Sequence, residues 1–175
     1  LPSRGVCAAL KKGIFKVSAD IEVTEAPIAD GGEGTVDAII TSAGGQKCVE
    51  CVAGPLGDKV KAYYGILRNG TAVIEMASAS GLYLVPKDKR NPLVTTSFGT
   101  GELIESALDR GCRKFIVGIG GSATNDGGAG MLQALGARFF DRYGREISCG
   151  GGNLDKLVKI DLSKMDKRIY ESQFI

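Results

Sequence analysis

The spacing of apolar residues along the chain follows two periods, and each period predicts one type of element. Apolar side chains three and four positions apart are typical of one face of an amphipathic helix. Strict alternation, or a short unbroken apolar run, is typical of a strand. Helices are therefore expected at residues 3–17, 36–43, 101–110 and 128–135, and extended segments or strands at 21–29, 47–52, 59–67, 71–77, 114–119 and 137–140.

The apolar faces of these helices are predicted to form the core. The face residues that carry this prediction are Val6, Leu10, Ile39, Leu103 and Leu108. Between two of the strands, residues 68–70 read Arg-Asn-Gly, and Asn-Gly is a strong signal for an antiparallel hairpin. A hairpin inside an otherwise alternating order of strands and helices predicts an α/β fold whose sheet is mixed rather than purely parallel.

Composition and charge narrow the class of protein. The 175 residues are 43% hydrophobic and 24% charged, with a net charge of +2, as in ordinary globular proteins. We therefore expect neither a nucleic-acid partner nor a membrane partner, while a homo-oligomer stays open. The five cysteines are an odd number, which favours reduced thiols in the cytoplasm. Cys48 and Cys51 have the C-x-x-C spacing, but positions three apart in a strand face opposite ways, so no redox or metal site is expected there.

Histidine is absent from the sequence, and glycine is frequent. Without histidine, any general base must be a carboxylate, a lysine, a tyrosine or a cysteine. Glycine accounts for 26 of the 175 residues, about twice the ordinary share, and it clusters at residues 31–34, 118–130 and 150–152. Such clusters are expected of loops that approach a phosphate or a substrate closely.

The longest glycine cluster lies between a strand and a helix. Residues 118–131 read G-I-G-G-S-A-T-N-D-G-G-A-G-M, with hydroxyl, amide and carboxylate side chains among the glycines. A strand that ends in such a loop and turns into a helix points free N–H groups and a positive helix end at one place. That place suits a phosphate or a carboxylate, and the predicted chemistry is phosphoryl transfer to a small hydroxy acid.

Phosphoryl transfer needs donors for phosphate oxygens, a carboxylate for Mg²⁺ and often a base for the acceptor hydroxyl. Asp126 is a candidate catalytic residue, with a plain helix cap as the alternative. Asp30, where an extended segment ends in Gly-Gly, is the candidate catalytic and Mg²⁺-binding residue, with an Asx turn as its alternative. The predicted cofactor-binding residues are Gly120, Gly121, Ser122, Thr124 and Asn125.

Short hydroxyl side chains and one arginine are candidates for substrate binding. Ser78 and Ser80 follow a strand, whereas Thr96 and Ser97 precede a Gly-Thr-Gly turn into a helix. All four are expected either to contact the substrate or to cap the helix that follows. Arg90, in a loop bracketed by prolines, is a candidate cation for the substrate, and a solvated loop charge is the alternative.

Several segments resemble those of the bacterial-type glycerate kinase family, and they occur in the family's order along nearly the whole chain. The resemblance implies ATP-dependent phosphorylation of D-glycerate, with the 2-hydroxyl favoured and with ATP and Mg²⁺ as cofactors. It also implies two α/β domains, one inserted in the other. The segments are 27–35 (PIADGGEGT), 54–58 (GPLGD), 74–82 (IEMASASGL), 90–93 (RNPL), 95–103 (TTSFGTGEL) and 118–131.

The resemblance also predicts how the chain maps onto such a kinase. Residues 1–45 are expected to be part of the first domain, and residues 46–175 part of the second, inserted domain that carries the glycine-rich loop. The family's N-terminal strand with its lysine-containing loop is not in the sequence, nor is roughly the C-terminal half of the family's length. We therefore expect an internal fragment whose residues 173–175 open a strand, and we expect activity of the full-length protein rather than of the fragment.

Two other functions fit parts of the sequence. Residues 118–123 match G-x-G-x-x-A after a strand, and Asp141 lies near the end of the next strand, where a ribose-binding acid is expected. A dinucleotide-binding oxidoreductase domain is thus the alternative, although the charge of Asp126 would repel a pyrophosphate and no repeated βαβ unit is predicted. A non-catalytic anion-binding module is the second alternative.

Overall fold

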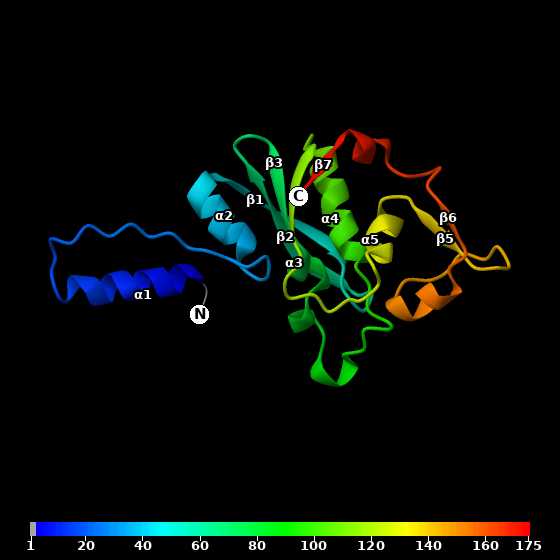
Figure 1. Ribbon diagram of the computed structural model, residues 1–175, viewed down its shortest axis with the longest axis horizontal. Coiled ribbons are helices and arrows are strands. Elements are labelled where there is room, and N and C mark those ends of the chain that lie inside the picture. Colours follow the sequence, from blue (N-terminus) through cyan, green and yellow to red (C-terminus); the bar gives the residue numbers. More distant parts are fainter. Residues whose placement is uncertain (1–2) are drawn as a thin grey trace.

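The fold is built on a mixed five-stranded sheet. The computed structural model describes residues 3–175. The strands lie in the order β1-β2-β3-β4-β7 (Figure 1), with antiparallel pairing from β1 to β3 and parallel pairing from β3 to β7. The predicted α/β class with a mixed sheet is therefore confirmed. The strands are β1 (Gly45–Ala53), β2 (Lys59–Leu67), β3 (Thr71–Glu75), β4 (Lys114–Gly118) and β7 (Gln173–Phe174).

The hairpin between β2 and β3 turns at the predicted Asn-Gly pair. Gly70 adopts a φ of 79°, and its amide donates to the carbonyl oxygen of Leu67 at 2.9 Å. β2 has the predicted bounds, but β3 ends earlier than expected because the chain turns into a short helix, α3 (Met76–Ser80). Ala77, Ser78, Ala79 and Ser80 of α3 are buried, and the helix contacts β2 and α4 (Phe98–Asp109).

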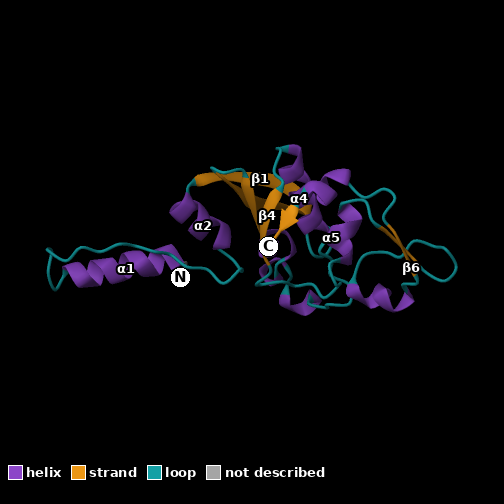
Figure 2. Cartoon of the chain, turned by 45° about the horizontal axis from the view of Figure 1, so that its top comes forward, coloured by secondary structure: helices purple, strands orange, loops and turns teal. Residues whose placement is uncertain are grey.

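Helices cover both faces of the sheet (Figure 2). α2 (Thr35–Ala43) packs on one face of β1–β3 and α4 on the other, with α5 (Ala129–Ala134) packed against α4. Alternation along β2 separates the two faces: the backbone of Gly65 lies under Val36 and Ile40 of α2, whereas the hydroxyl of Tyr64 is 3.0 Å from that of Ser106 in α4.

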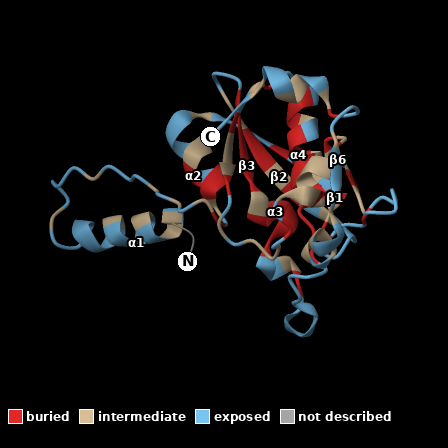
Figure 3. Cartoon of the chain, turned by 45° about the vertical axis from the view of Figure 1, so that its right-hand side comes forward, coloured by how far each residue is buried: buried red, intermediate tan, exposed pale blue. Residues whose placement is uncertain are grey.

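The main core lies between the sheet and α4 (Figure 3). Leu103 and Leu108 of α4 are buried there, as the helical period predicts, and they pack with Ile74 and Phe115 of the sheet. On the opposite face, Ile39 of α2 is half-buried.

The first helix forms where it is predicted, but its apolar face is not core. None of the residues of α1 (Ser3–Phe15) is buried, and Val6 and Leu10 are 42% and 62% exposed. Figure 1 shows α1 lying away from the sheet, alongside the coil that follows it. The prediction for these two side chains is wrong because an amphipathic period shows that a face can be buried, not that the fold supplies a partner for it.

Three further segments complete the described chain. Residues 21–29 form coil rather than a strand, while the expected strand at residues 137–140 is β5 (Arg138–Phe140). β5 pairs with β6 (Lys159–Asp161) in a separate two-stranded sheet. None of the described helices has the length and apolar character needed to cross a lipid bilayer.

Candidate active site

Two glycine-rich loops, at residues 31–34 and 118–121, pack backbone to backbone beside the end of β4. The amide of Gly120 donates to the carbonyl oxygen of Gly31 at 3.0 Å. A Cβ on Gly118 would lie 2.5 Å from that oxygen, and a Cβ on Gly120 would lie 2.6 Å from the amide nitrogen of Gly32. Only glycine allows this approach of the two backbones. We call residues 31–34 and 118–121 the paired loops.

The pairing changes the interpretation of the glycines. The sequence predicts that the amide of Gly120 is a phosphate donor, but here that amide is occupied by Gly31. The glycines at 118 and 120 serve the contact between two segments that lie far apart in the sequence. Gly121 follows with a φ of 73°, and its carbonyl oxygen accepts from the amide of Leu82 at 2.8 Å.

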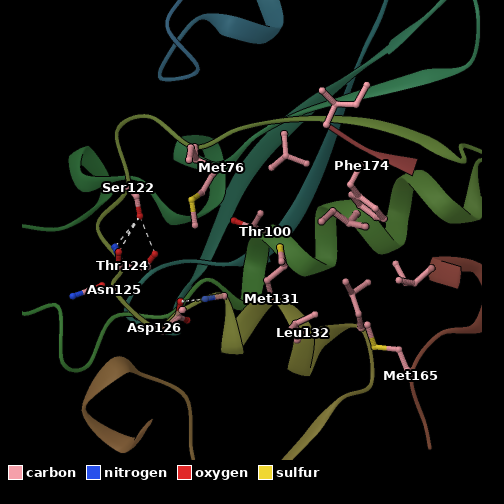
Figure 4. A pocket seen from close by; sticks show the side chains of 18 residues that line it. Met76, Thr100, Ser122, Thr124, Asn125, Asp126, Met131, Leu132, Met165 and Phe174 are labelled. Carbon is pink, nitrogen blue, oxygen red and sulfur yellow. Dashed lines mark hydrogen bonds between the residues drawn. The ribbon is translucent and has the colours of Figure 1, made fainter. Parts of the chain in front are cut away.

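The polar part of the long loop, residues 122–126, forms one end of a cavity of about 770 Å³ (Figure 4). The hydroxyls of Ser122 and Thr124 lie 2.8 Å apart, and the amide of Thr124 donates to the Ser122 hydroxyl at 3.0 Å. Thr100 of α4 also lines the cavity. The rest of the wall is mainly apolar and includes Met76, Val117, Ile119, Met131, Leu132 and Met165. Such a combination of an apolar wall and a few polar groups at one end is typical of small-molecule sites.

Asp126 is only 2% exposed and joins the beginnings of two helices. Its carboxylate accepts from the amide of Ser97 at 2.8 Å, from the Ser97 hydroxyl at 2.8 Å, and from the amides of Gly128 and Gly130 at 3.1 and 3.2 Å. The Ser97 hydroxyl in turn accepts from the amide of Met131 at 3.0 Å. Asp126 therefore acts as a cap shared by α4 and α5, and a direct catalytic role stays a prediction.

Asp30 lies on the other side of the paired loops. Its side chain is exposed, and Oδ1 accepts from the amide of Gly32 at 3.0 Å, which is the Asx turn considered above. It lines a second cavity, of about 450 Å³, together with Glu33 and Asp37. The structure therefore does not bring Asp30 and Asp126 into one cavity. Within residues 3–175, no three carboxylate or cysteine side chains form a cluster suited to a metal ion.

Most of the predicted substrate-binding residues are buried and do not line the cavity. Ser78 and Ser80 are fully buried in α3: the Ser78 hydroxyl accepts from the amide of Tyr63 at 2.7 Å, and that of Ser80 lies 2.9 Å from the Thr100 hydroxyl. Thr96 is 6% exposed, and its hydroxyl accepts from the amide of Phe98, so it caps α4.

Arg90 lies apart from both cavities. Its guanidinium donates to the carbonyl oxygens of Val85 and Leu82, at 3.3 and 3.4 Å, and so ties down the loop that contains it.

Glu75 is a residue of the site region that the sequence reasoning did not single out. It is fully buried at the end of β3, and Oε2 accepts from the amides of Gly34 and Val36, each at 3.1 Å. Oε1 accepts from the hydroxyl of Tyr63 at 3.0 Å. Burial, reinforced by the nearby charge of Glu75, raises the pKa of Tyr63. The available signal was a single acidic residue in the otherwise apolar run Ala-Val-Ile-Glu-Met.

The cysteines behave as the strand pattern predicts. Cys48 is buried and Cys51 is exposed, so the two face opposite sides of β1, and all five cysteines are free.

Comparison with known proteins decides the family. The glycerate kinase family profile matches residues 1–175. The chain belongs to the glycerate kinase family. The chain is 54% identical over 162 residues to a glycerate kinase of Bacillus subtilis (strain 168), covering 92% of this chain and 42% of that protein. It is 55% identical over 170 residues to the glycerate 2-kinase of Escherichia coli (strain K12), covering 97% of this chain and 45% of that protein.

A solved structure agrees with this family assignment. The crystal structure of a Salmonella typhimurium LT2 protein assigned as a glycerate kinase 2 superposes with a TM-score of 0.84 at 50% identity. The superposition covers 95% of this chain and 46% of that one. The chain thus spans less than half the length of these glycerate kinases. Its division into residues 1–45 and 46–175 stays a prediction, while α2 packs on the sheet of the second part.

The geometry also removes the basis of the oxidoreductase alternative. In a dinucleotide-binding fingerprint the helix begins directly at the glycine turn, whereas α5 begins at Ala129, several residues after the motif. Asp141 belongs to the hairpin that follows β5, where it pairs with Arg145 at 3.0 Å. Since β5 lies in a different sheet from β4, Asp141 is not placed as a ribose-binding acid.

Proposed function

We propose that the protein transfers a phosphoryl group from ATP to D-glycerate, at the 2-hydroxyl. The family match along the whole chain supports the reaction, and the name of the Escherichia coli relative supports the 2-position. The observation that carries the proposal is the polar loop at residues 122–126, which follows the paired loops and forms one end of a cavity of about 770 Å³. Since the chain spans less than half of its relatives, the proposal concerns the full-length protein.

We assign Ser122, Thr124 and Asn125 to the phosphate oxygens of ATP. All three line the larger cavity. The Ser122 hydroxyl lies 2.8 Å from the Thr124 hydroxyl and 3.3 Å from the Thr124 carbonyl oxygen. When Ser122 donates within the loop, the Thr124 hydroxyl hydrogen is left to donate to a ligand oxygen. The amide of Gly121 is a further donor in this proposal. The apolar walls of the cavity suit the base of a nucleotide.

We assign Asp30 to Mg²⁺ and to the hydroxyl of glycerate. Mg²⁺ takes one or two protein carboxylates together with phosphate oxygens and water, and the exposed Asp30, in the lining of the smaller cavity, offers one such carboxylate. When bound, the ion neutralises negative charge on the transferred group. Asp30 is also the candidate acceptor of the hydroxyl proton, because it is an exposed carboxylate in the lining of the same cavity.

The remaining predicted residues support this site from below. Asp126 and Ser97 hold α5 against α4 and thereby fix the far end of the polar loop. The carbonyl oxygen of Ser80 accepts from the amide of Ala123 at 2.9 Å and so supports the polar loop. Direct contact of Ser78, Ser80, Thr96 and Arg90 with substrate stays a prediction. The five free cysteines support a cytoplasmic location, where disulfides are rare.

The test is an assay of ADP release by the purified full-length protein. We expect release with ATP, Mg²⁺ and D-glycerate together, and only background release when glycerate is omitted or replaced by 3-hydroxypropionate, which lacks the 2-hydroxyl. Asp30→Asn is expected to lower kcat by about a hundredfold or more, the range for loss of an acid–base group. If wild-type ADP release is the same with and without glycerate, the proposed function is wrong.

A further inference from the structure

We propose that Glu75 is a positioning residue of the phosphoryl-transfer site: its buried carboxylate fixes the geometry of the paired loops. The inference rests on the proposed function, because it concerns the same site. Glu75 touches neither cavity, so it is not a catalytic residue.

The first step of the argument is the set of partners of the carboxylate. Glu75 is fully buried, and its partners are the amides of Gly34 and Val36 and the hydroxyl of Tyr63, at 3.0 to 3.1 Å. The two amides belong to the beginning of α2, where free N–H groups and the helix dipole favour a negative charge. Burial of a carboxylate costs free energy unless such partners are in place, so the buried Glu75 depends on these three hydrogen bonds.

The second step is what those partners carry. Gly34 is the last residue of the loop at 31–34, and it has a φ of 91°. Through Gly34 the carboxylate fixes the C-terminal end of this loop. The N-terminal end is fixed by the bond between the Gly31 carbonyl oxygen and the Gly120 amide. Asp30 lies immediately before that bond.

The third step links the anchor to the other loop. Glu75 ends β3, and Gly118 ends β4 directly beside it in the parallel register. The loop at 118–121 therefore leaves the sheet beside Glu75, and Glu75 ties the loop at 31–34 to the same end of the sheet. If the carboxylate is removed, residues 31–34 lose their fixed position, and with them the surface on which Gly118 and Gly120 rest. Asp30 and Ser122, at opposite ends of the paired loops, then lose their fixed separation.

If Glu75 only stabilised the fold, its variants would behave differently. Three variants of the full-length protein distinguish such a stabilising role from the proposed positioning role. Glu75→Ala removes every bond of the carboxylate. Glu75→Asp shortens the side chain by one methylene and so withdraws the oxygens from the amides. Glu75→Gln keeps an oxygen for the two amides and an NH₂ group that can donate to the Tyr63 oxygen.

The matched control is Glu50→Ala. Glu50 is also a hydrogen-bonded carboxylate of the sheet: it accepts from the Ser106 hydroxyl at 2.8 Å and from Arg110 at 3.0 Å. It lies on β1, away from the paired loops. It therefore reports the effect of losing a hydrogen-bonded carboxylate of the same sheet without disturbing the site.

We expect Glu75→Ala and Glu75→Asp to lower kcat/KM for glycerate by about tenfold to a hundredfold, the effect of a small misplacement at a reacting centre. Glu75→Gln is expected to recover most of that loss, and Glu50→Ala to leave kcat/KM unchanged. In hydrogen–deuterium exchange, Glu75→Ala and Glu75→Asp should raise exchange in peptides covering both 31–36 and 118–122.

Two results would overturn the inference. One is that Glu75→Asp melts at a lower temperature but retains wild-type kcat/KM and wild-type exchange in peptide 118–122. The other is that Glu75→Gln is as impaired as Glu75→Ala. If Glu75→Ala does not fold, the aspartate and glutamine variants decide the matter. Failure of the proposed function is separable, because it appears as absence of glycerate-dependent ADP release in the wild type, while the exchange data still test the anchor.

Discussion

At the scale of single residues, this chain uses buried carboxylates to hold backbone segments in place. Asp126 joins the beginnings of α4 and α5, and Glu75 joins the end of β3 to the beginning of α2. Both carboxylates accept from backbone amides at helix starts, where the unpaired N–H groups favour negative charge. The polar residues that the sequence offers as ligands thus include some that organise the site without touching a ligand.

Removing the shared cap at Asp126 is expected to destabilise the protein. Asp126→Ala leaves the amides of Gly128 and Gly130 and the Ser97 hydroxyl without their acceptor, and we expect a loss of about 2 to 4 kcal/mol in the free energy of unfolding. Urea denaturation of the full-length protein measures it. Asp88→Ala, at an exposed position, is the control and should be neutral. Equal stability of the two variants would contradict the shared cap.

Adding a side chain at the contact between the paired loops is expected to impair the site. Gly120→Ala places a Cβ 2.6 Å from the amide nitrogen of Gly32, so the loops must separate. We expect kcat/KM for glycerate to fall by about tenfold or more. Gly13→Ala is the matched control, because its Cβ meets nothing within 4 Å and alanine favours the helix. Unchanged activity of Gly120→Ala would show that the contact between the loops is not needed.

At the scale of elements, the periodicity of apolar residues predicted where helices and strands lie better than it predicted which side chains are buried. β2 has its predicted bounds because its alternation and the Asn-Gly turn agree. The strand expected at 71–77 extends past β3 because Met76 and Ala77 continue its apolar character, although the chain turns into α3 at Met76. For α1, the period predicted the helix correctly, but Val6 and Leu10 on its apolar face are exposed. Burial depends on long-range partners, which the local pattern does not contain.

The contact between β1 and α4 makes part of the stability depend on pH. Hydrogen bonds from Ser106 and Arg110 lower the pKa of Glu50 below its ordinary value of 4.5. A lowered pKa contributes stability that is fully present above the ordinary value and is lost as the pH falls through the folded-state pKa.

Glu50→Gln should therefore be less stable than the wild type at pH 7, and the difference should shrink as the pH falls below 4.5. Thermal melting across this range measures the effect, with the exposed Glu22→Gln as the control. A difference that stays constant with pH would show that the ionised form of Glu50 contributes nothing.

At the scale of the whole molecule, the candidate site is divided by the paired loops into two cavities, with Asp30 on one side and residues 122–126 on the other. The sequence identified both loops through their glycines and polar residues. It did not reveal that the glycines at 118 and 120 serve contact with residues 31 and 32, because that contact joins segments more than eighty positions apart. Nor did it reveal Glu75, whose role depends on the fold bringing β3 beside α2.

The central claim is that the paired loops build a site that phosphorylates glycerate. The most direct measurement is ³¹P and ¹H NMR of the product formed by the full-length wild-type protein from ATP, Mg²⁺ and D-glycerate. The predicted result is accumulation of 2-phosphoglycerate in step with ADP. Conversion of ATP with no phosphorylated glycerate in the spectrum would contradict the claim, and 3-phosphoglycerate as the sole product would contradict the assignment of the 2-hydroxyl.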